Sequence, residues 1–113
     1  MIMELLFSYG TLQQEHVQIA NFGRVLKGNS DVLPCYNITK IKISDKKVLD
    51  ISCEEFHPIL KYTGDNNDEV SGTIFELTKS EIKRADDYEV DDYKRVRARL
   101  KSGRNCWIYA AAK

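Results

Sequence analysis

The chain has 113 residues, of which 42% are apolar and 30% are charged, a balance typical of a folded soluble domain and unlike that of a disordered or fibrous protein. Its 17 basic and 17 acidic residues cancel, so it lacks the basic excess with which proteins bind nucleic-acid phosphates, and we expect no nucleic-acid partner. The length fits one core, so we expect a single domain over residues 1–113.

The chain contains three cysteines, Cys35, Cys53 and Cys106, which are widely spaced and form no CxxC pair. An odd, scattered set argues against a disulfide framework and against a tetrahedral zinc site. We interpret all three as small buried apolar side chains in a reducing compartment. The first residues, MIMELLF, show no basic leader and are too short to cross a bilayer, so we expect a cytoplasmic protein with no membrane partner.

The first third of the chain predicts one strand and one short helix. The run MELLFSY (3–9) is short and apolar and stops at Gly10, which favours a buried strand. QQEHVQIANF (13–22) has weak helical spacing, enough for a turn or two. The small polar residues at 28–30 predict a turn.

The middle of the chain predicts strands and one loop. YNITKIKI (36–43) alternates with period two, as a half-buried antiparallel strand does. EEFHPIL (54–60) contains Pro58, which restricts it to a sheet edge or an irregular connection because proline donates no ladder hydrogen bond. KYTGDNNDE (61–69) is small, polar and acidic, and predicts a loop.

The last third has the clearest local signals. VSGTIFEL (70–77) is a further apolar strand, and Thr78 followed by Glu81 is a capping box that begins a helix. A hairpin follows, with strands YKRVRARL (93–100) and CWIYAA (106–111) around the turn KSGRN. The sum predicts an α/β (α+β) fold, a small, partly closed mixed β-barrel flanked by one or two short helices.

Two segments raise the question of function. In LFSYGTLQ a strand ends in a small polar turn, whose backbone N–H groups either close the strand or face a ligand. Where the later helix ends, five acidic residues crowd together, and one interpretation is a solvated acidic bend balanced by Lys94 or Arg95. Glu89 differs from its neighbours, because it lies near the inward helix face between two tyrosines. A carboxyl held against apolar surface and other negative charges has a raised pKa, as a general base near neutral pH requires. The acidic residues are Asp86, Asp87, Glu89, Asp91 and Asp92.

Other side chains have two interpretations each. His57 is a surface or structural histidine, or a second proton carrier near the pocket. Trp107 and Tyr109 alternate on the last strand and favour barrel core over a substrate platform. Three arginines share one strand face, which predicts a solvated face, with contact to an anionic group as the alternative: Arg95, Arg97 and Arg99.

Four motifs in order resemble the γ-glutamylcyclotransferase-like family, which includes γ-glutamylamine cyclotransferase and the plant AIG2-like proteins. They are YGTL closing the first strand, VSGTIFELT before the helix, ADDYE at its end and YKR opening the next strand. The resemblance implies a small β-barrel flanked by helices. It also implies that Glu89 is the catalytic acid/base, that Tyr93 lies beside the pocket, and that one loop binds the α-carboxylate of a γ-glutamyl group through backbone N–H groups. That loop consists of Tyr9, Gly10, Thr11 and Leu12.

The chemistry of such a substrate fits these parts. The α-amino group attacks its own γ-carbonyl, giving 5-oxoproline and a free amine, and well-oriented intramolecular attack can be worth ~7–11 kcal/mol of barrier. Gly10 suits an anion-binding turn because glycine tolerates positive φ and close approach. Loop N–H groups or the Tyr93 hydroxyl are candidates for stabilising the oxyanion.

This sequence departs from the family pattern at two positions. It has Val90 where the family often has glycine, and Ala85 where the family commonly has leucine. Both positions bear on which amine is accepted and on how efficient turnover is. The reaction requires no metal and no cofactor, so we expect none, and we expect one partner, a small γ-glutamyl substrate, with the protein a monomer or weak homodimer. The alternatives are a protein that binds the ligand without turnover and an interaction module whose barrel mouth is filled.

Overall fold

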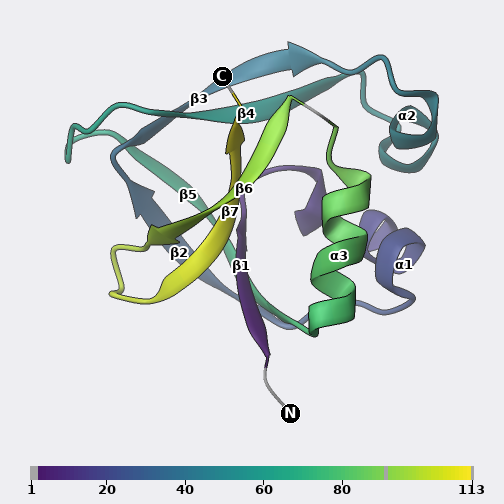
Figure 1. Cartoon of the computed structure of the whole chain (residues 1–113), viewed down its shortest axis with the longest axis horizontal. Coiled ribbons are helices and arrows are strands. Elements are labelled where there is room, and N and C mark those ends of the chain that lie inside the picture. Colours follow the sequence, from purple (N-terminus) through teal and green to yellow (C-terminus); the bar gives the residue numbers. More distant parts are fainter. Residues whose placement is uncertain (1–2, 91, 113) are drawn as a thin grey trace.

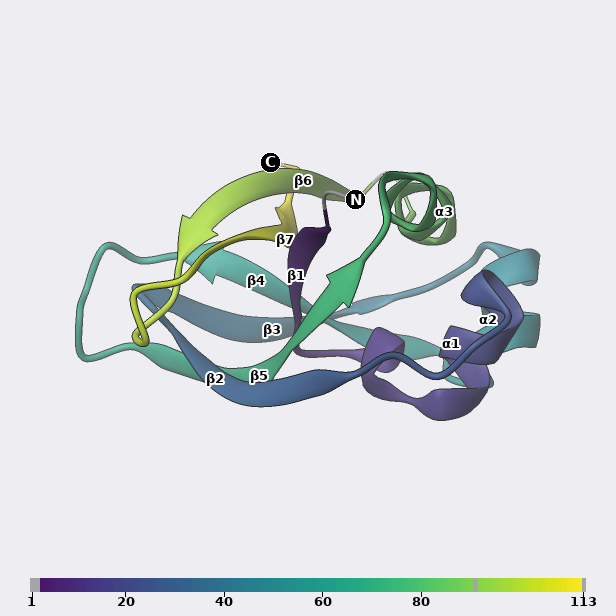
Figure 2. The same cartoon turned by 90° about the horizontal axis from the view of Figure 1, so that it is seen from below.

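A computed structural model describes residues 3–90 and 92–112. In this part of the chain seven strands form one mixed sheet in the order β2-β5-β1-β7-β4-β3, with β6 paired to β7. The sheet curves into a half-barrel, and three α-helices lie beside one end of it (Figures 1 and 2). The predicted fold class is therefore confirmed. The strands are β1 (Glu4–Ser8), β2 (Gly28–Pro34), β3 (Tyr36–Lys42), β4 (Phe56–Tyr62), β5 (Glu69–Leu77), β6 (Tyr93–Arg99) and β7 (Asn105–Ala111).

The helices are the 3-10 turn η1 (Thr11–Gln13), α1 (Glu15–Phe22), α2 (Lys46–Ser52) and α3 (Lys79–Tyr88). None of the described helices is both long and apolar enough to cross a membrane. The structure adds α2 in a segment for which the sequence predicted no helix. Asp45 caps it by accepting a hydrogen bond from the Val48 N–H, which satisfies one of the free donors at a helix start.

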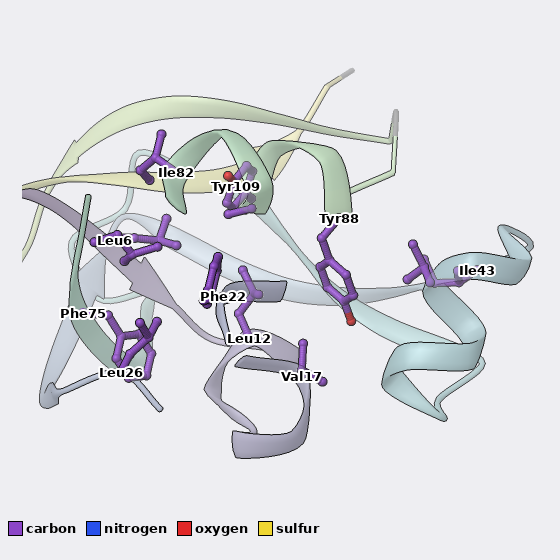
Figure 3. Packing of buried hydrophobic residues seen from close by; sticks show 13 residues of the cluster. Leu6, Leu12, Val17, Phe22, Leu26, Ile43, Phe75, Ile82, Tyr88 and Tyr109 are labelled. Carbon is purple, nitrogen blue, oxygen red and sulfur yellow. The ribbon is translucent and has the colours of Figure 1, made fainter. Parts of the chain in front are cut away.

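Both faces of the central strands are buried, because alternate side chains enter different apolar clusters. Leu6 of β1 and Tyr109 of β7 pack with the helices, as Figure 3 shows. Their neighbours Phe7 and Ile108 belong to a second cluster built from the strands and their connections. The strand β1 thus lies between two cores, which explains why its sequence reads as a continuous apolar run.

Helix α3 carries the capping box that the sequence predicted. The Thr78 hydroxyl accepts a hydrogen bond from the Glu81 N–H, and the Glu81 carboxylate accepts one from the Thr78 N–H. Ile82, Ala85 and Tyr88 face the core, and Ala85 is fully buried. The Glu81 carboxylate additionally pairs with the Arg24 guanidinium through two hydrogen bonds of 2.8 Å, so the start of α3 is tied to the chain just after α1.

The predicted turn at 28–30 is wrong, because these residues begin β2. Glycine at position 28 serves close packing: a Cβ there would lie 2.5 Å from the Thr73 Cγ2 and 2.6 Å from the Phe75 ring of the neighbouring strand. The sequence around it looks like a turn only because close strand packing and turns both favour glycine.

Two other strand predictions need correction. β4 is a regular strand between β7 and β3, whereas the sequence predicted an edge or irregular segment. It pairs with β7 at Leu60, two residues beyond Pro58, and Pro58 lines a cavity, which accommodates its missing donor. β3 is antiparallel to β4 as predicted, but most of its residues are exposed, because it is the last strand of the sheet order.

The interpretation of the cysteines holds for Cys106, which is fully buried and whose pKa burial raises to about 11. It is wrong for Cys53, which is exposed, and for Cys35, which is half-buried. Both have positive φ, 59° and 70°, so they occupy backbone positions in turns, where side chains point outward.

Candidate functional site

The structure brings the two segments singled out by the sequence to one cavity. All six predicted site residues line it, from the segment after β1, the end of α3 and the start of β6. The cavity is narrow: the volume open to the centre of a water molecule is about 20 Å³, room for roughly one water. Its lining residues are Phe7, Ser8, Tyr9, Gly10, Thr11, Leu12, His57, Pro58, Glu89, Tyr93 and Tyr109.

The turn after β1 begins a short 3-10 helix, whose geometry leaves donors free. Its hydrogen bonds are donated by the N–H groups of Gln13 to Gly10 and of Gln14 to Thr11. The N–H groups of Thr11 and Leu12 precede these donors, so the turn itself offers them no acceptor. Consecutive N–H groups at such a position can bind an anion.

Gly10 adopts φ −129° and ψ −143°, so the argument from positive φ does not apply to it. What glycine provides here is space. A Cβ at this position would lie 3.2 Å from the Cγ of Pro58, on the opposite side of the cavity lining, and would narrow a site that is already tight.

The Glu89 carboxyl is half-buried, and no side chain among the described residues pairs with it. Glu89 follows the last residue of α3, and its N–H donates to the Ala85 carbonyl. Burial, and secondarily the negative charge of Asp86, raise the pKa of the Glu89 carboxyl from its ordinary 4.5 to about 8. Within the described part of the chain no side-chain hydrogen bond or ion pair reaches it. A carboxyl with these properties can take up and release a proton near neutral pH.

Four tyrosines surround Glu89, and its charge contributes to raising the pKa of each of them after burial: Tyr9, Tyr88, Tyr93 and Tyr109. Three of their hydroxyls donate to fixed acceptors. Tyr9 donates to the Tyr109 carbonyl, Tyr93 to the Pro58 carbonyl at 2.6 Å, and Tyr109 to the Asp86 carboxylate at 2.7 Å. The Tyr93 proton is therefore engaged with a backbone oxygen, so in this structure the Tyr93 hydroxyl is not placed to donate to an oxyanion.

The fourth tyrosine joins the two halves of the site directly. The Tyr88 hydroxyl and the Thr11 hydroxyl lie 2.8 Å apart and are buried. Figure 3 shows the Tyr88 ring extending from the end of α3 between the elements that carry Val17 and Ile43.

His57 is buried, in agreement with the structural interpretation of this residue. Its Nε2 lies 3.1 Å from the Ser52 Oγ at the end of α2. Burial lowers its pKa, so the ring is neutral at neutral pH. It does line the cavity, but its Nε2 is already hydrogen-bonded to the Ser52 hydroxyl.

Five lining residues are not among the six predicted site residues, although His57 was considered as a second proton carrier. They are Phe7, Ser8, His57, Pro58 and Tyr109. Tyr109 belongs to the buried core, as the sequence predicted, and it also borders the cavity. In the hairpin, Tyr109 pairs with Arg95 on β6. This pairing of a tyrosine with an arginine was the feature of the sequence that could have indicated a role near the site. Trp107 is half-buried on the same face, with the guanidinium groups of Arg95 and Arg97 each 4.3 Å from its ring centre.

The predicted acidic bend is partly paired. Asp86 accepts one hydrogen bond from Arg95, as one interpretation expected, whereas Asp87 and Asp92 are exposed. Asp91 lies outside the described residues. Among residues 3–90 and 92–112 no three His, Cys, Asp or Glu side chains converge in a way that could hold a metal ion.

Comparison with known proteins identifies related sequences and folds. The family model described as "Gamma-glutamyl cyclotransferase, AIG2-like" matches residues 6–113. No curated protein matches the sequence.

Solved structures resemble the whole described fold at low sequence identity. A protein of Arabidopsis thaliana aligns with a TM-score of 0.72 and 18% identity, covering 98% of this chain and 63% of that one. An uncharacterized protein of Homo sapiens aligns with 0.74 and 17%, covering 98% and 68%. A structure described as a gamma-glutamyl cyclotransferase aligns with 0.68 and 16%, covering 99% and 68%. The chain thus spans less than two thirds of the Arabidopsis protein, and identities this low support the fold alone.

Proposed function

Because this chain belongs to the AIG2-like gamma-glutamyl cyclotransferase family, we propose that it cleaves a γ-glutamyl amine or γ-glutamyl-amino acid into 5-oxoproline and a free amine. The observation that carries the proposal is the Glu89 carboxyl, which pairs with no side chain in the described part of the chain, has its pKa raised to about 8 and shares a cavity with the turn that follows β1.

Substrate orientation is the first task of the site. The N–H groups of Thr11 and Leu12 receive the α-carboxylate, which fixes the end of the molecule that carries the nucleophile. Pro58 and Tyr93 line the same cavity. Because the cavity now admits about one water, the lining side chains separate when a γ-glutamyl group enters. Water is excluded as they close around it, so the cyclising conformer is held without competing hydrolysis.

Proton transfer is the second task, and Glu89 performs both halves of it. The α-amino group reacts as the neutral amine, after its ammonium form has released a proton to solvent. As its nitrogen bonds to the γ-carbon, the ionised Glu89 carboxylate takes one of its two protons, and the nitrogen keeps the other as the lactam N–H. The bond from that carbon to the leaving nitrogen breaks as Glu89 returns the same proton to it. A base with a pKa near the working pH is suited to both steps, so we expect the rate to rise with pH toward about 8.

The test is turnover by the purified chain. We would incubate it with γ-glutamyl-butylamine and γ-glutamyl-alanine and measure 5-oxoproline by mass spectrometry. Removing a general acid/base lowers the rate by roughly 10²–10⁴-fold, which is the loss expected for Glu89→Gln. The matched control is Glu76→Gln, the same change at an exposed position on β5, which should keep the wild-type rate.

The outcomes separate the competing functions. Turnover that Glu89→Gln leaves intact rejects the proposed mechanism. Binding of the γ-glutamyl amide, measured by calorimetry, without 5-oxoproline favours a ligand-binding protein that lacks the reaction. Absence of both binding and turnover favours an interaction module.

A further inference from the structure

Asp86 organises one wall of the cavity without lining it. Its Oδ1 accepts two hydrogen bonds, one from the Tyr109 hydroxyl at 2.7 Å and one from the Arg95 Nε at 2.8 Å. Tyr109 lines the cavity, and its carbonyl accepts the hydroxyl of Tyr9, which lies in the predicted carboxylate-binding loop. One carboxylate on α3 therefore connects β6, β7 and the segment after β1.

Asp86 also lies beside Glu89. The two residues are three positions apart at the end of α3, a spacing that makes side chains neighbours on a helix surface. Together with Tyr93, Arg95 and Tyr109 they line one surface groove. The guanidinium of Arg95 lies over the Trp107 ring. Asp86 is therefore held by two hydrogen-bond donors, Arg95 and Tyr109, of which the first is itself packed in place.

Many ionisable groups lie around Glu89, and they differ in their effect on the pKa of its carboxyl. Burial is the main cause of its raised pKa, and Asp86 is the charge that adds to it. The neighbouring groups come from every element around the site: Tyr9 after β1, Lys42 from β3, Asp45 at the start of α2, His57 from β4, Asp86, Asp87 and Tyr88 from α3, Asp92 before β6, Tyr93 and Arg95 from β6, and Tyr109 from β7.

We propose that Asp86 is a positioning residue of the site, which holds Tyr109 in the cavity wall and Arg95 in the adjoining groove and places a negative charge beside the Glu89 carboxyl. This inference rests on the proposed function, in which ionisation of that carboxyl begins the proton transfer. Asp86 itself touches no substrate. It acts by keeping the base protonated below neutral pH and by keeping Tyr109 a hydrogen-bond donor, since its bond to Asp86 adds to burial in raising the pKa of that phenol.

The test compares two variants that should act in opposite directions. Asp86→Asn retains an oxygen that can accept from Tyr109 and Arg95 but removes the charge, so Glu89 ionises at lower pH, by about 0.5–1 pH unit because the pair is partly exposed and screened. Arg95→Gln removes the cation that offsets Asp86, so Glu89 ionises at higher pH. The control is Asp87→Asn, the same charge change at an exposed carboxylate one residue along. The charge of Asp87 is not among the causes of the raised Glu89 pKa, so we expect a clearly smaller shift than in Asp86→Asn.

Two readouts keep this inference separate from the proposed function. The carbon-13 titration of the Glu89 carboxyl by NMR reports its ionisation whether or not the chain turns over substrate. The acid limb of the pH profile of kcat/KM should move by the same amount if Glu89 is the base. Equal titration shifts in Asp86→Asn and Asp87→Asn, or no opposite shift in Arg95→Gln, would overturn the inference. Titration shifts without a matching kinetic shift would uphold it and count against the role of Glu89.

Discussion

The buried hydrogen bond between Tyr88 and Thr11 is the closest direct link between the two halves of the candidate site. One partner precedes Glu89 and the other lies in the turn after β1. Removing one hydroxyl deprives the other of this partner, which costs about 1–3 kcal/mol for a buried group, whereas replacing both by apolar groups of similar shape costs less. We therefore expect Tyr88→Phe and Thr11→Val each to lower the free energy of unfolding, and the double variant to lose less than their sum.

Urea denaturation of the four proteins measures this coupling, which we expect to be about 1 kcal/mol. The control pairs Tyr88→Phe with Thr63→Val, in the loop where the Thr63 hydroxyl accepts from the Asp65 N–H. These two sites share no contact partner, so their effects should add. Strict additivity for the Tyr88 and Thr11 pair would show that the bond contributes nothing to stability.

Some residues of the cavity could be predicted from the sequence and others could not. Glu89 was distinguished by its place between tyrosines at the end of an amphipathic helix, which is local information. The involvement of Tyr9 to Leu12 came from the resemblance to a family. His57 and Pro58 enter the cavity because β4 lies beside β7, and strand order is a long-range property that no local pattern carries.

Helix α3 positions Glu89, and its capping box holds the other end of that helix. Thr78→Ala removes the hydroxyl that accepts from the Glu81 N–H, and we expect a loss of about 1 kcal/mol in the free energy of unfolding. Thr78→Ser keeps the acceptor and should stay within a few tenths of wild type. Hydrogen exchange of the first-turn amides of α3 is the local readout, and protection unchanged in Thr78→Ala would contradict the role of this cap.

The contrast between α3 and α2 shows what a sequence reveals at the level of elements. α3 has a reciprocal cap and three inward residues at helical spacing, so its start and its buried face could both be predicted. α2 has seven residues, of which only Val48 and Ser52 are buried. Its valine and isoleucine favour strands, and its only helix signal is the capping residue Asp45, so the sequence did not predict this helix. The strand that begins at Gly28 was missed for another reason: the close packing of the Phe75 ring on the neighbouring strand leaves no room for a side chain at position 28.

At the scale of the whole molecule, the site exists because β1 and β7 are parallel neighbours in a mixed sheet. β1 delivers the turn at Tyr9, and the hairpin of β6 and β7 delivers Tyr93 and Tyr109 to the same place. Helix α3 connects β5 to β6 and brings Glu89 over this junction. Fold class could be predicted from alternation and length, but this convergence depends on the pairing of distant strands.

The raised pKa of Glu89 makes the stability of the whole protein depend on pH. In the unfolded chain this carboxyl ionises near 4.5, whereas in the folded chain it ionises near 8. Between these values the unfolded state has released a proton that the folded state retains, so this group reduces stability progressively as pH rises toward 8. Glu89→Gln removes the penalty, and we expect it to be more stable than wild type by about 1–3 kcal/mol at pH 8, with little difference at pH 4.5.

Two other groups change stability with the opposite sign, so the comparison must be between proteins at each pH. Burial lowers the pKa of His57, and its contribution is lost as pH falls below about 6.5. The Arg24 ion pair lowers the pKa of Glu81 to about 2, and its contribution is lost only below about 4.5. Both act equally in wild type and in Glu89→Gln. Urea denaturation from pH 4.5 to 8.5, with exposed Glu76→Gln as control, therefore isolates Glu89: the two curves should diverge as pH rises, and parallel curves would mean that this carboxyl is as well hydrated in the folded protein as in the unfolded chain.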